Sequence, residues 1–215
     1  MALDPTEASR RMRKLAAMAP VIPVLVIEDP AHARPLAEAL ATGGLPVLEV
    51  TLRTAAAAQA IREMTRVPGV IVGAGTVVSP ADVRIARAAG AEFAVSPGAT
   101  DALLDACAHD DLPLLPGAAT ASEAMALLAR GYDMLKFFPA EPAGGAAALK
   151  ALGGPLPQIA FCPTGGVSAA NAPDYLALPT VPCVGGSWVA PGPLVAAGDW
   201  SAIRALAEEA SRLPR

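Results

Sequence analysis

The sequence predicts an α/β fold, namely a single (β/α)8 TIM barrel with an extra N-terminal helix. Eight short apolar runs recur along the 215 residues, and consecutive runs start 21 to 25 residues apart. Most runs are continuous stretches of Val, Ile and Leu, which is typical of parallel strands covered on both faces. Alanine-rich segments with helix signals separate the runs, and no segment resembles an interdomain linker. Eight strand–helix units in one chain of this length indicate a closed barrel.

The eight runs define the strands that we expect. They cover residues 21–27, 46–53, 70–77, 92–98, 113–118, 134–140, 159–166 and 183–190. An open doubly wound sheet is the alternative architecture. No Gly-x-Gly-x-x-Gly motif follows the first run, however, and the even spacing of eight units favours closure.

The segments between the runs carry helix start and stop signals. Residues that favour the first turn of a helix precede five of them. These are Asp29 before Pro30, Ser79 before Pro80, Thr54, Asp199, and Thr120 with Glu123 in the spacing of a capping box. Glycines stand where three of the helices should end, at Gly43, Gly90 and Gly131.

These elements predict one domain over residues 1–215. We expect a helix within residues 1–20 to cap the barrel, which covers residues 21–198. A C-terminal helix is expected within residues 199–215.

Composition excludes several classes of protein. Hydrophobic residues make up 53% of the chain, charged residues 17%, and the mean hydropathy is +0.45, so the chain is neither disordered nor a coiled coil. The longest apolar run, residues 15–27, contains two prolines and is shorter than the roughly 20 residues of a membrane-spanning helix. A net charge of −4, 4% aromatic residues and the lack of a basic stripe argue against nucleic-acid binding.

The cysteines predict a reducing compartment. Cys107, Cys162 and Cys183 are odd in number and far apart, so neither structural disulfides nor a zinc site is expected, and we predict a cytoplasmic protein. Residues 9–11 followed by the apolar run loosely resemble a twin-arginine signal. The prolines in that run favour a strand instead, and Glu28 and Asp29 stand between the run and the proposed cleavage motif at residues 31–33.

One lysine is the strongest candidate for chemistry. The site of such barrels lies at the carboxyl ends of the strands. Lys14 and Lys150 fall in helical segments, whereas Lys136 lies inside an apolar run near the end of a strand. Loss of water favours the neutral amine of a lysine, which can attack a carbonyl carbon and form a Schiff base. The alternative is a structural ion pair between this lysine and a buried carboxylate.

The second run supplies polar partners. Glu49, Thr51 and Arg53 have the same parity along the strand, so we expect them to form one inward row. An acid, a hydroxyl and a cation on a buried face are costly unless they serve a site or neutralise one another. A structural Glu49–Arg53 pair is the alternative.

The last two runs end in glycine pairs, Gly165-Gly166 and Gly185-Gly186, the second followed by Ser187. Glycines let backbone N–H groups approach an anion closely, and the loops after strands seven and eight form the usual phosphate site of this fold. Neither loop contains a basic residue, so the backbone itself must bind the anion.

Six motifs together resemble the 2-keto-3-deoxy-6-phosphogluconate (KDPG) aldolase family over nearly the whole chain. They are LEVTLRT at 48–54, GAGTV at 73–77, SPG at 96–98, KFFPAE at 136–141, FCPTGG at 161–166 and GGSW at 185–188. The resemblance implies a class I aldolase of the Entner–Doudoroff pathway that cleaves KDPG to pyruvate and glyceraldehyde 3-phosphate. It also implies cleavage of 4-hydroxy-2-oxoglutarate (KHG) to pyruvate and glyoxylate, a homotrimer, and no metal cofactor.

By this resemblance, Lys136 forms the Schiff base and Glu49 transfers protons. The other residues implied are Arg53, Thr76 and the backbone near Pro97 for the pyruvyl carboxylate, Phe138 beside the lysine, Thr164 near the substrate hydroxyls, and Gly165, Gly166, Gly186 and Ser187 for the phosphate.

Three other functions compete with this interpretation. A metal-dependent aldolase needs clustered ligands, but both histidines, His32 and His109, fall in helical segments. A non-catalytic phosphosugar-binding barrel would need neither Lys136 nor Glu49. A galactonate-type substrate, which differs in the configuration at C4, stays open.

Overall fold

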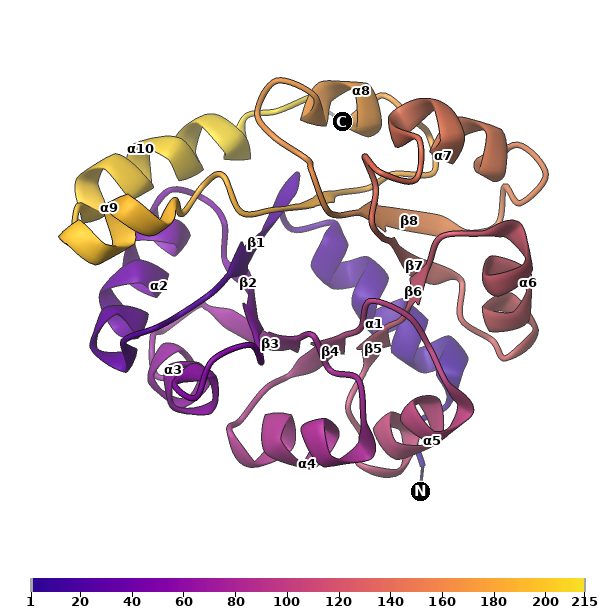
Figure 1. Ribbon diagram of the computed structural model, residues 1–215, viewed down its shortest axis with the longest axis horizontal. Coiled ribbons are helices and arrows are strands. Elements are labelled where there is room, and N and C mark those ends of the chain that lie inside the picture. Colours follow the sequence, from indigo (N-terminus) through magenta and orange to yellow (C-terminus); the bar gives the residue numbers. More distant parts are fainter. Residues whose placement is uncertain (1, 215) are drawn as a thin grey trace.

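The computed structural model describes residues 2–214 and has an α/β fold whose strands are all parallel (Figure 1). The strands are β1 Val21–Leu25, β2 Val47–Thr51, β3 Ile71–Gly75, β4 Phe93–Val95, β5 Leu114–Leu115, β6 Gly117–Ala118, β7 Met134–Phe137, β8 Ala160–Pro163 and β9 Val184–Gly186. Each of the eight predicted runs therefore contains strand residues.

Helices surround the strands in Figure 1. They are α1 Pro5–Ala16, α2 Ala33–Thr42, α3 Ala57–Met64, α4 Pro80–Ala88, α5 Asp101–His109, α6 Ala121–Ala129, α7 Gly145–Gly153, α8 Ala172–Leu176, α9 Gly192–Ala197 and α10 Trp200–Ser211, with a 3-10 turn, η1, over Pro30–His32. No helix among residues 2–214 has both the length and the apolar character needed to cross a bilayer.

The strands form a curled six-stranded sheet in the order β5-β4-β3-β2-β1-β9 and a three-stranded sheet in the order β6-β7-β8. A parallel bridge between Thr164 and Gly185 joins the ends of β8 and β9. The fifth predicted run contains two strands, β5 and β6. The described residues therefore form nine strands where the sequence predicted eight. Pro116 stands at the division, and because proline has no N–H it cannot donate to the ladder. Before Pro116 the chain pairs with β4, and after it with β7.

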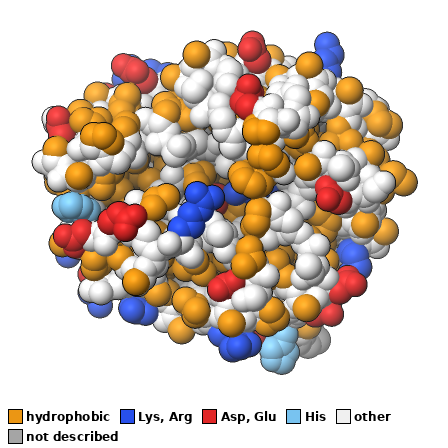
Figure 2. Space-filling view, in the orientation of Figure 1, with side chains coloured by type: hydrophobic (Ala, Val, Ile, Leu, Met, Phe, Trp, Pro, Cys, Tyr) orange, Lys and Arg blue, Asp and Glu red, His pale blue; other side chains and the backbone are white. Residues whose placement is uncertain are grey.

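Two hydrophobic layers hold the fold together. The larger lies between the strands and the outer helices. The smaller fills the space enclosed by the strands, where side chains near the strands' amino ends, such as Val47, Phe93 and Met134, pack against Met12 and Ala16 of α1. The helix predicted within residues 1–20 thus covers the amino ends of the strands. Figure 2 shows one end of the molecule hollowed, with Lys and Arg side chains near the centre.

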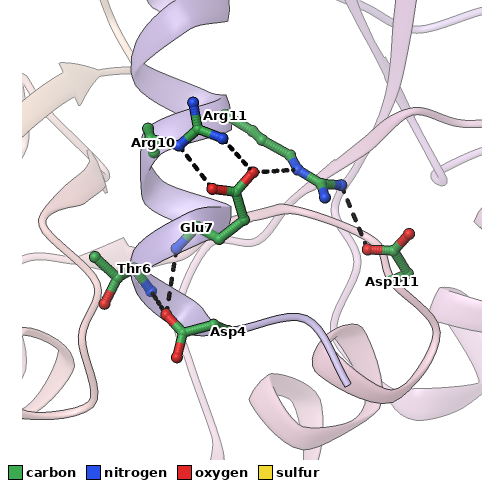
Figure 3. Close-up of polar contacts among 6 residues, drawn as sticks. All are labelled: Asp4, Thr6, Glu7, Arg10, Arg11 and Asp111. Atoms are coloured by element: carbon green, nitrogen blue, oxygen red, sulfur yellow. Dashed lines mark hydrogen bonds and ion pairs between the residues drawn. The ribbon is translucent and has the colours of Figure 1, made fainter. Parts of the chain in front are cut away.

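A polar network holds α1 in place (Figure 3). Asp4 caps the helix and accepts hydrogen bonds from the backbone N–H groups of its first turn. Glu7 bonds both Arg10 and Arg11, and Arg11 reaches Asp111 at the end of α5. Hydrogen bonds from Arg10 and then Arg11 lower the pKa of Glu7 to about 2.

Most of the predicted helix caps are present. Ser79 caps α4, Asp199 caps α10, and Thr120 forms a full capping box with Glu123 on α6. Asp29 caps the 3-10 turn η1 rather than an α-helix. The prediction for Thr54 was wrong: α3 begins at Ala57, and the Thr54 hydroxyl instead donates to the carbonyl of Ile27, tying the end of β2 to the loop after β1.

Candidate functional site

A cavity of about 480 Å³ opens at the carboxyl ends of the strands. All eleven site residues suggested by the sequence line it: Glu49, Arg53, Thr76, Pro97, Lys136, Phe138, Thr164, Gly165, Gly166, Gly186 and Ser187. The parity of β2 also holds, because Thr51 lines the cavity with Glu49 and Arg53. The hollow in Figure 2 therefore gathers polar groups from strands far apart in the sequence.

Lys136 and Glu49 form the buried centre of this cavity. Lys136 Nζ lies 3.3 Å from Glu49 Oε1, and only 6% and 4% of the two side chains are exposed. The Phe138 ring lies 5.3 Å from the ammonium, in the range of a cation–π contact. Each charge thus has a partner, while the cavity leaves the lysine open to a small molecule.

Gly75 makes room for the carboxylate. It ends β3, beside Thr51 of β2. A Cβ at this position would lie 2.2 Å from Glu49 Oε1, a distance that real side chains do not adopt. The absence of a side chain at residue 75 therefore allows Glu49 to reach Lys136.

Arg53 and Thr76 lie together at the rim. Arg53 Nε lies 3.4 Å from Thr76 Oγ1, and Arg53 is exposed. Glu49 pairs with Lys136, not with Arg53, so the structural Glu49–Arg53 pair is not formed. Thr76 has a φ of +58°, which is unfavourable for a β-branched residue and is found mainly where a structure needs a particular side-chain direction.

The loop after β8 has an unusual arrangement of peptide groups. Three consecutive carbonyls accept hydrogen bonds from the protein: that of Thr164 from Ala140 N (2.8 Å), that of Gly165 from Glu141 N (3.0 Å) and that of Gly166 from Asn171 Nδ2 (3.1 Å). In a trans peptide the N–H points opposite to the carbonyl. The Gly165 N–H, which follows the first carbonyl, points to the β9 side, where the parallel bridge joins Thr164 to Gly185. Within residues 2–214, the N–H groups that follow the other two carbonyls, on Gly166 and Val167, have no acceptor. We call these two N–H groups the amide cradle.

The other charged candidates lie away from the cavity. Lys14 and Lys150 are exposed on α1 and α7, and His32 and His109 lie in η1 and α5, as predicted. In the part of the chain that the structure describes, no three His, Cys, Asp or Glu side chains are arranged to hold a metal ion. Glu141 is exposed, and its carboxylate accepts a hydrogen bond from Tyr175.

Sequence reasoning missed the apolar residues of the cavity wall. Val24 and Val26 line it from the first run, and Pro139, Pro142 and Val167 line it from loops. The parity rule that places Glu49, Thr51 and Arg53 on one face would also have placed the two valines there, had it been applied to the first run. Because the prolines lie in a loop without periodicity, no pattern indicates their direction.

A sequence model of KDPG and KHG aldolases matches residues 12–206. The chain belongs to this family. It is an aldolase, a carbon–carbon lyase. The aldolase is 55% identical over 192 residues to the 2-dehydro-3-deoxy-phosphogluconate aldolase of Pseudoalteromonas atlantica, an alignment that covers 89% of each chain.

Solved structures share the fold of the aldolase. The KDPG aldolase of Zymomonas mobilis with 3-phosphoglycerate is 50% identical, with a TM-score of 0.91 over 96% of this chain and 98% of that one. The KDPG aldolase of Legionella pneumophila, with pyruvate captured as a covalent carbinolamine, is 47% identical, with a TM-score of 0.89 and the same coverage.

Proposed function

We propose that this aldolase cleaves KDPG to pyruvate and glyceraldehyde 3-phosphate, and KHG to pyruvate and glyoxylate, through an imine on Lys136. The observation that carries this proposal is the buried Lys136–Glu49 pair, 3.3 Å apart at the bottom of an open cavity. The covalent carbinolamine in the Legionella pneumophila relative supports the same chemistry.

The reaction starts when the lysine loses a proton. Glu49 Oε1 is close enough to accept it directly, and the neutral amine of Lys136 attacks the C2 carbonyl of the substrate. Glu49 returns the proton to the carbinolamine oxygen and then moves a second proton from the nitrogen to the hydroxyl, so that water leaves and an iminium forms. Glu49 then accepts the proton of the C4 hydroxyl while the C3–C4 electrons move into the iminium. The aldehyde leaves, Glu49 protonates the enamine carbon, and hydrolysis of the new imine releases pyruvate and restores the lysine.

The rim residues orient the substrate around this centre. Arg53 pairs with the pyruvyl carboxylate, supported by the Thr76 hydroxyl 3.4 Å from its Nε and by the backbone near Pro97. Phe138 packs beside the imine, and Thr164, on the neighbouring strand, faces the substrate hydroxyls.

The phosphate binds to the loops that follow β8 and β9, against the backbone of Gly165, Gly166 and Gly186 and through Ser187. The amide cradle supports this assignment, since neighbouring N–H groups that converge in one loop bind an anion without a basic side chain. A phosphate there has its sugar chain directed toward Lys136, across the same cavity.

Further features belong to the same proposal. The two sheets form one closed (β/α)8 barrel, supported by the Thr164–Gly185 bridge and by the shared hydrophobic interior. The chain is one domain, with α1 as its N-terminal cap, the barrel over residues 21–198 and α10 as the C-terminal helix. The enzyme works without a metal, in the cytoplasm, as a homotrimer.

A pyruvate-coupled assay with EDTA tests the function. KDPG, its galactonate-type C4 epimer and KHG are each offered as substrates, and we expect the highest kcat/KM with KDPG. A higher kcat/KM with the epimer would establish the galactonate alternative. If none of the three substrates yields pyruvate, the protein is a non-catalytic phosphosugar-binding barrel.

Borohydride trapping tests the site. Treatment with pyruvate and borohydride should add one reduced pyruvyl group per chain, on the peptide that contains Lys136. Lys14 and Lys150 are exposed and serve as internal controls, because labelling at either would contradict the mechanism.

A further inference from the structure

We propose that Asn171 and Tyr175 are positioning residues that orient the amide cradle toward the phosphate of the substrate. Neither side chain lines the cavity. The inference deepens the proposed function and rests on it, because it concerns how one part of that substrate is recognised.

Asn171 acts on the cradle directly. It precedes α8, and its Nδ2 donates to the Gly166 carbonyl at 3.1 Å, while its Oδ1 accepts from Ser168 N at 2.7 Å and lies 3.2 Å from Ser168 Oγ. The Gly166 carbonyl belongs to the same peptide group as the Val167 N–H. By holding the carbonyl outward, the amide of Asn171 turns that N–H in the opposite direction. The side chain therefore fixes the last peptide of the cradle and the start of the segment that follows.

Tyr175 acts one step further away, through Glu141. Its hydroxyl donates a hydrogen bond to Glu141 Oε1, and the tyrosine is fully buried on α8. Burial first, and then the hydrogen bond to the Glu141 carboxylate, raise the pKa of Tyr175, so the hydroxyl remains a donor. The backbone N–H of Glu141 in turn donates to the Gly165 carbonyl at 3.0 Å. Fixing Glu141 thus fixes the first peptide of the cradle, which carries the Gly166 N–H.

Gly166 accommodates the stem of Glu141. Its φ is +80°, and a Cβ at this position would lie 2.7 Å from both Cβ and Cγ of Glu141. The glutamate therefore packs directly on the backbone of the cradle. Its carboxylate has the same sign of charge as a phosphate, and the Tyr175 hydroxyl holds it toward α8. Side chains on and just before one short helix thus anchor both peptide groups of the cradle.

Two single variants test the two contacts separately. Asn171→Ala removes the donor to Gly166, and Tyr175→Phe removes only a hydroxyl while it keeps the buried ring. Asp174→Asn is the matched control, because Asp174 lies between them in sequence and its side chain is exposed. For each protein, kcat and KM are measured with KDPG, which has a phosphate, and with KHG, which has none. Thermal unfolding and borohydride trapping with pyruvate show whether the variants are folded and retain the lysine chemistry.

We expect both variants to raise the KM for KDPG about fivefold, the effect of one net hydrogen bond. The kcat with KDPG and both constants with KHG should stay within twofold, and Asp174→Asn should match the parent. An equal loss with both substrates would overturn the proposal, since it would indicate a general structural role, and so would an unchanged KM for KDPG. If Asn171→Ala fails to fold, Tyr175→Phe alone decides, by the change in its KM for KDPG compared with the change in its KM for KHG. Failure of the parent to cleave KDPG or to trap pyruvate at Lys136 would instead refute the proposed function.

Discussion

The substitution Gly75→Ala tests whether the position of the Glu49 carboxylate, and not only its presence, determines the rate. The new Cβ would stand 2.2 Å from Glu49 Oε1, whereas an ordinary contact needs at least 3.4 Å. Removing the overlap moves the carboxylate by about 1.2 Å. The Lys136–Glu49 separation is already 3.3 Å, so a displacement of this size away from the lysine breaks the hydrogen bond. Misplacement of a catalytic group by about 1 Å can cost about 10²-fold in rate, and we expect a loss of that order in kcat.

The measurement is steady-state cleavage of KDPG, together with borohydride trapping of pyruvate at Lys136. Trapping should persist, because the lysine and its cavity remain, whereas turnover should fall. Gly192→Ala is the control: no described atom lies within 4 Å of its added Cβ, and Gly192 begins α9 and does not line the cavity. A Gly75→Ala enzyme with kcat within threefold of the parent would refute the reasoning.

Three further outcomes can be checked on the same protein. Glu49→Gln should keep the fold and some pyruvate trapping but lose about 10²–10⁴-fold in kcat, because the amide accepts no proton; turnover within about threefold of the parent would make Glu49 structural. Ser187→Ala should weaken KDPG by about 1–2 kcal/mol in kcat/KM while the value for KHG changes little, and a parallel fall with both substrates would argue against a phosphate site there. Cys107 is buried, and its burial raises the pKa of the thiol to about 12, so alkylation at pH 8 should label it only after unfolding; rapid labelling of the native protein would contradict that burial.

The strands could be predicted from the sequence because each one lies in a short stretch of mostly apolar residues. Runs such as 46–53 and 70–77 contain β2 and β3, each shorter at its ends than the run that contains it. Pro116 is the instructive exception. The residue is visible in the sequence, but whether a proline ends a strand or only interrupts its edge depends on which neighbours need its N–H, and that is a property of the assembled sheet.

Parity along a strand is the reason that much of the cavity could be anticipated. Glu49, Thr51 and Arg53 alternate along β2, so one choice of face places all three. The partner of Glu49 was less accessible to such reasoning. Pairing with Arg53 was as compatible with the spacing as pairing with Lys136, because the distance across the enclosed space depends on the curvature of the sheet.

Recognition of the phosphate depends on information that a local pattern does not carry. The glycines at 165 and 166 are visible in the sequence, but a glycine pair allows many peptide orientations. What selects one of them is a set of three hydrogen bonds from Ala140, Glu141 and Asn171, each at least five residues from the carbonyl that it holds. Nothing near Tyr175 in the sequence indicates that its hydroxyl reaches Glu141 in the loop after β7. In this aldolase the groups proposed to react follow the period of the strands, whereas the groups that orient the backbone toward an anion come from a neighbouring loop and helix. The second set is therefore found only when the three-dimensional partners of each carbonyl are known.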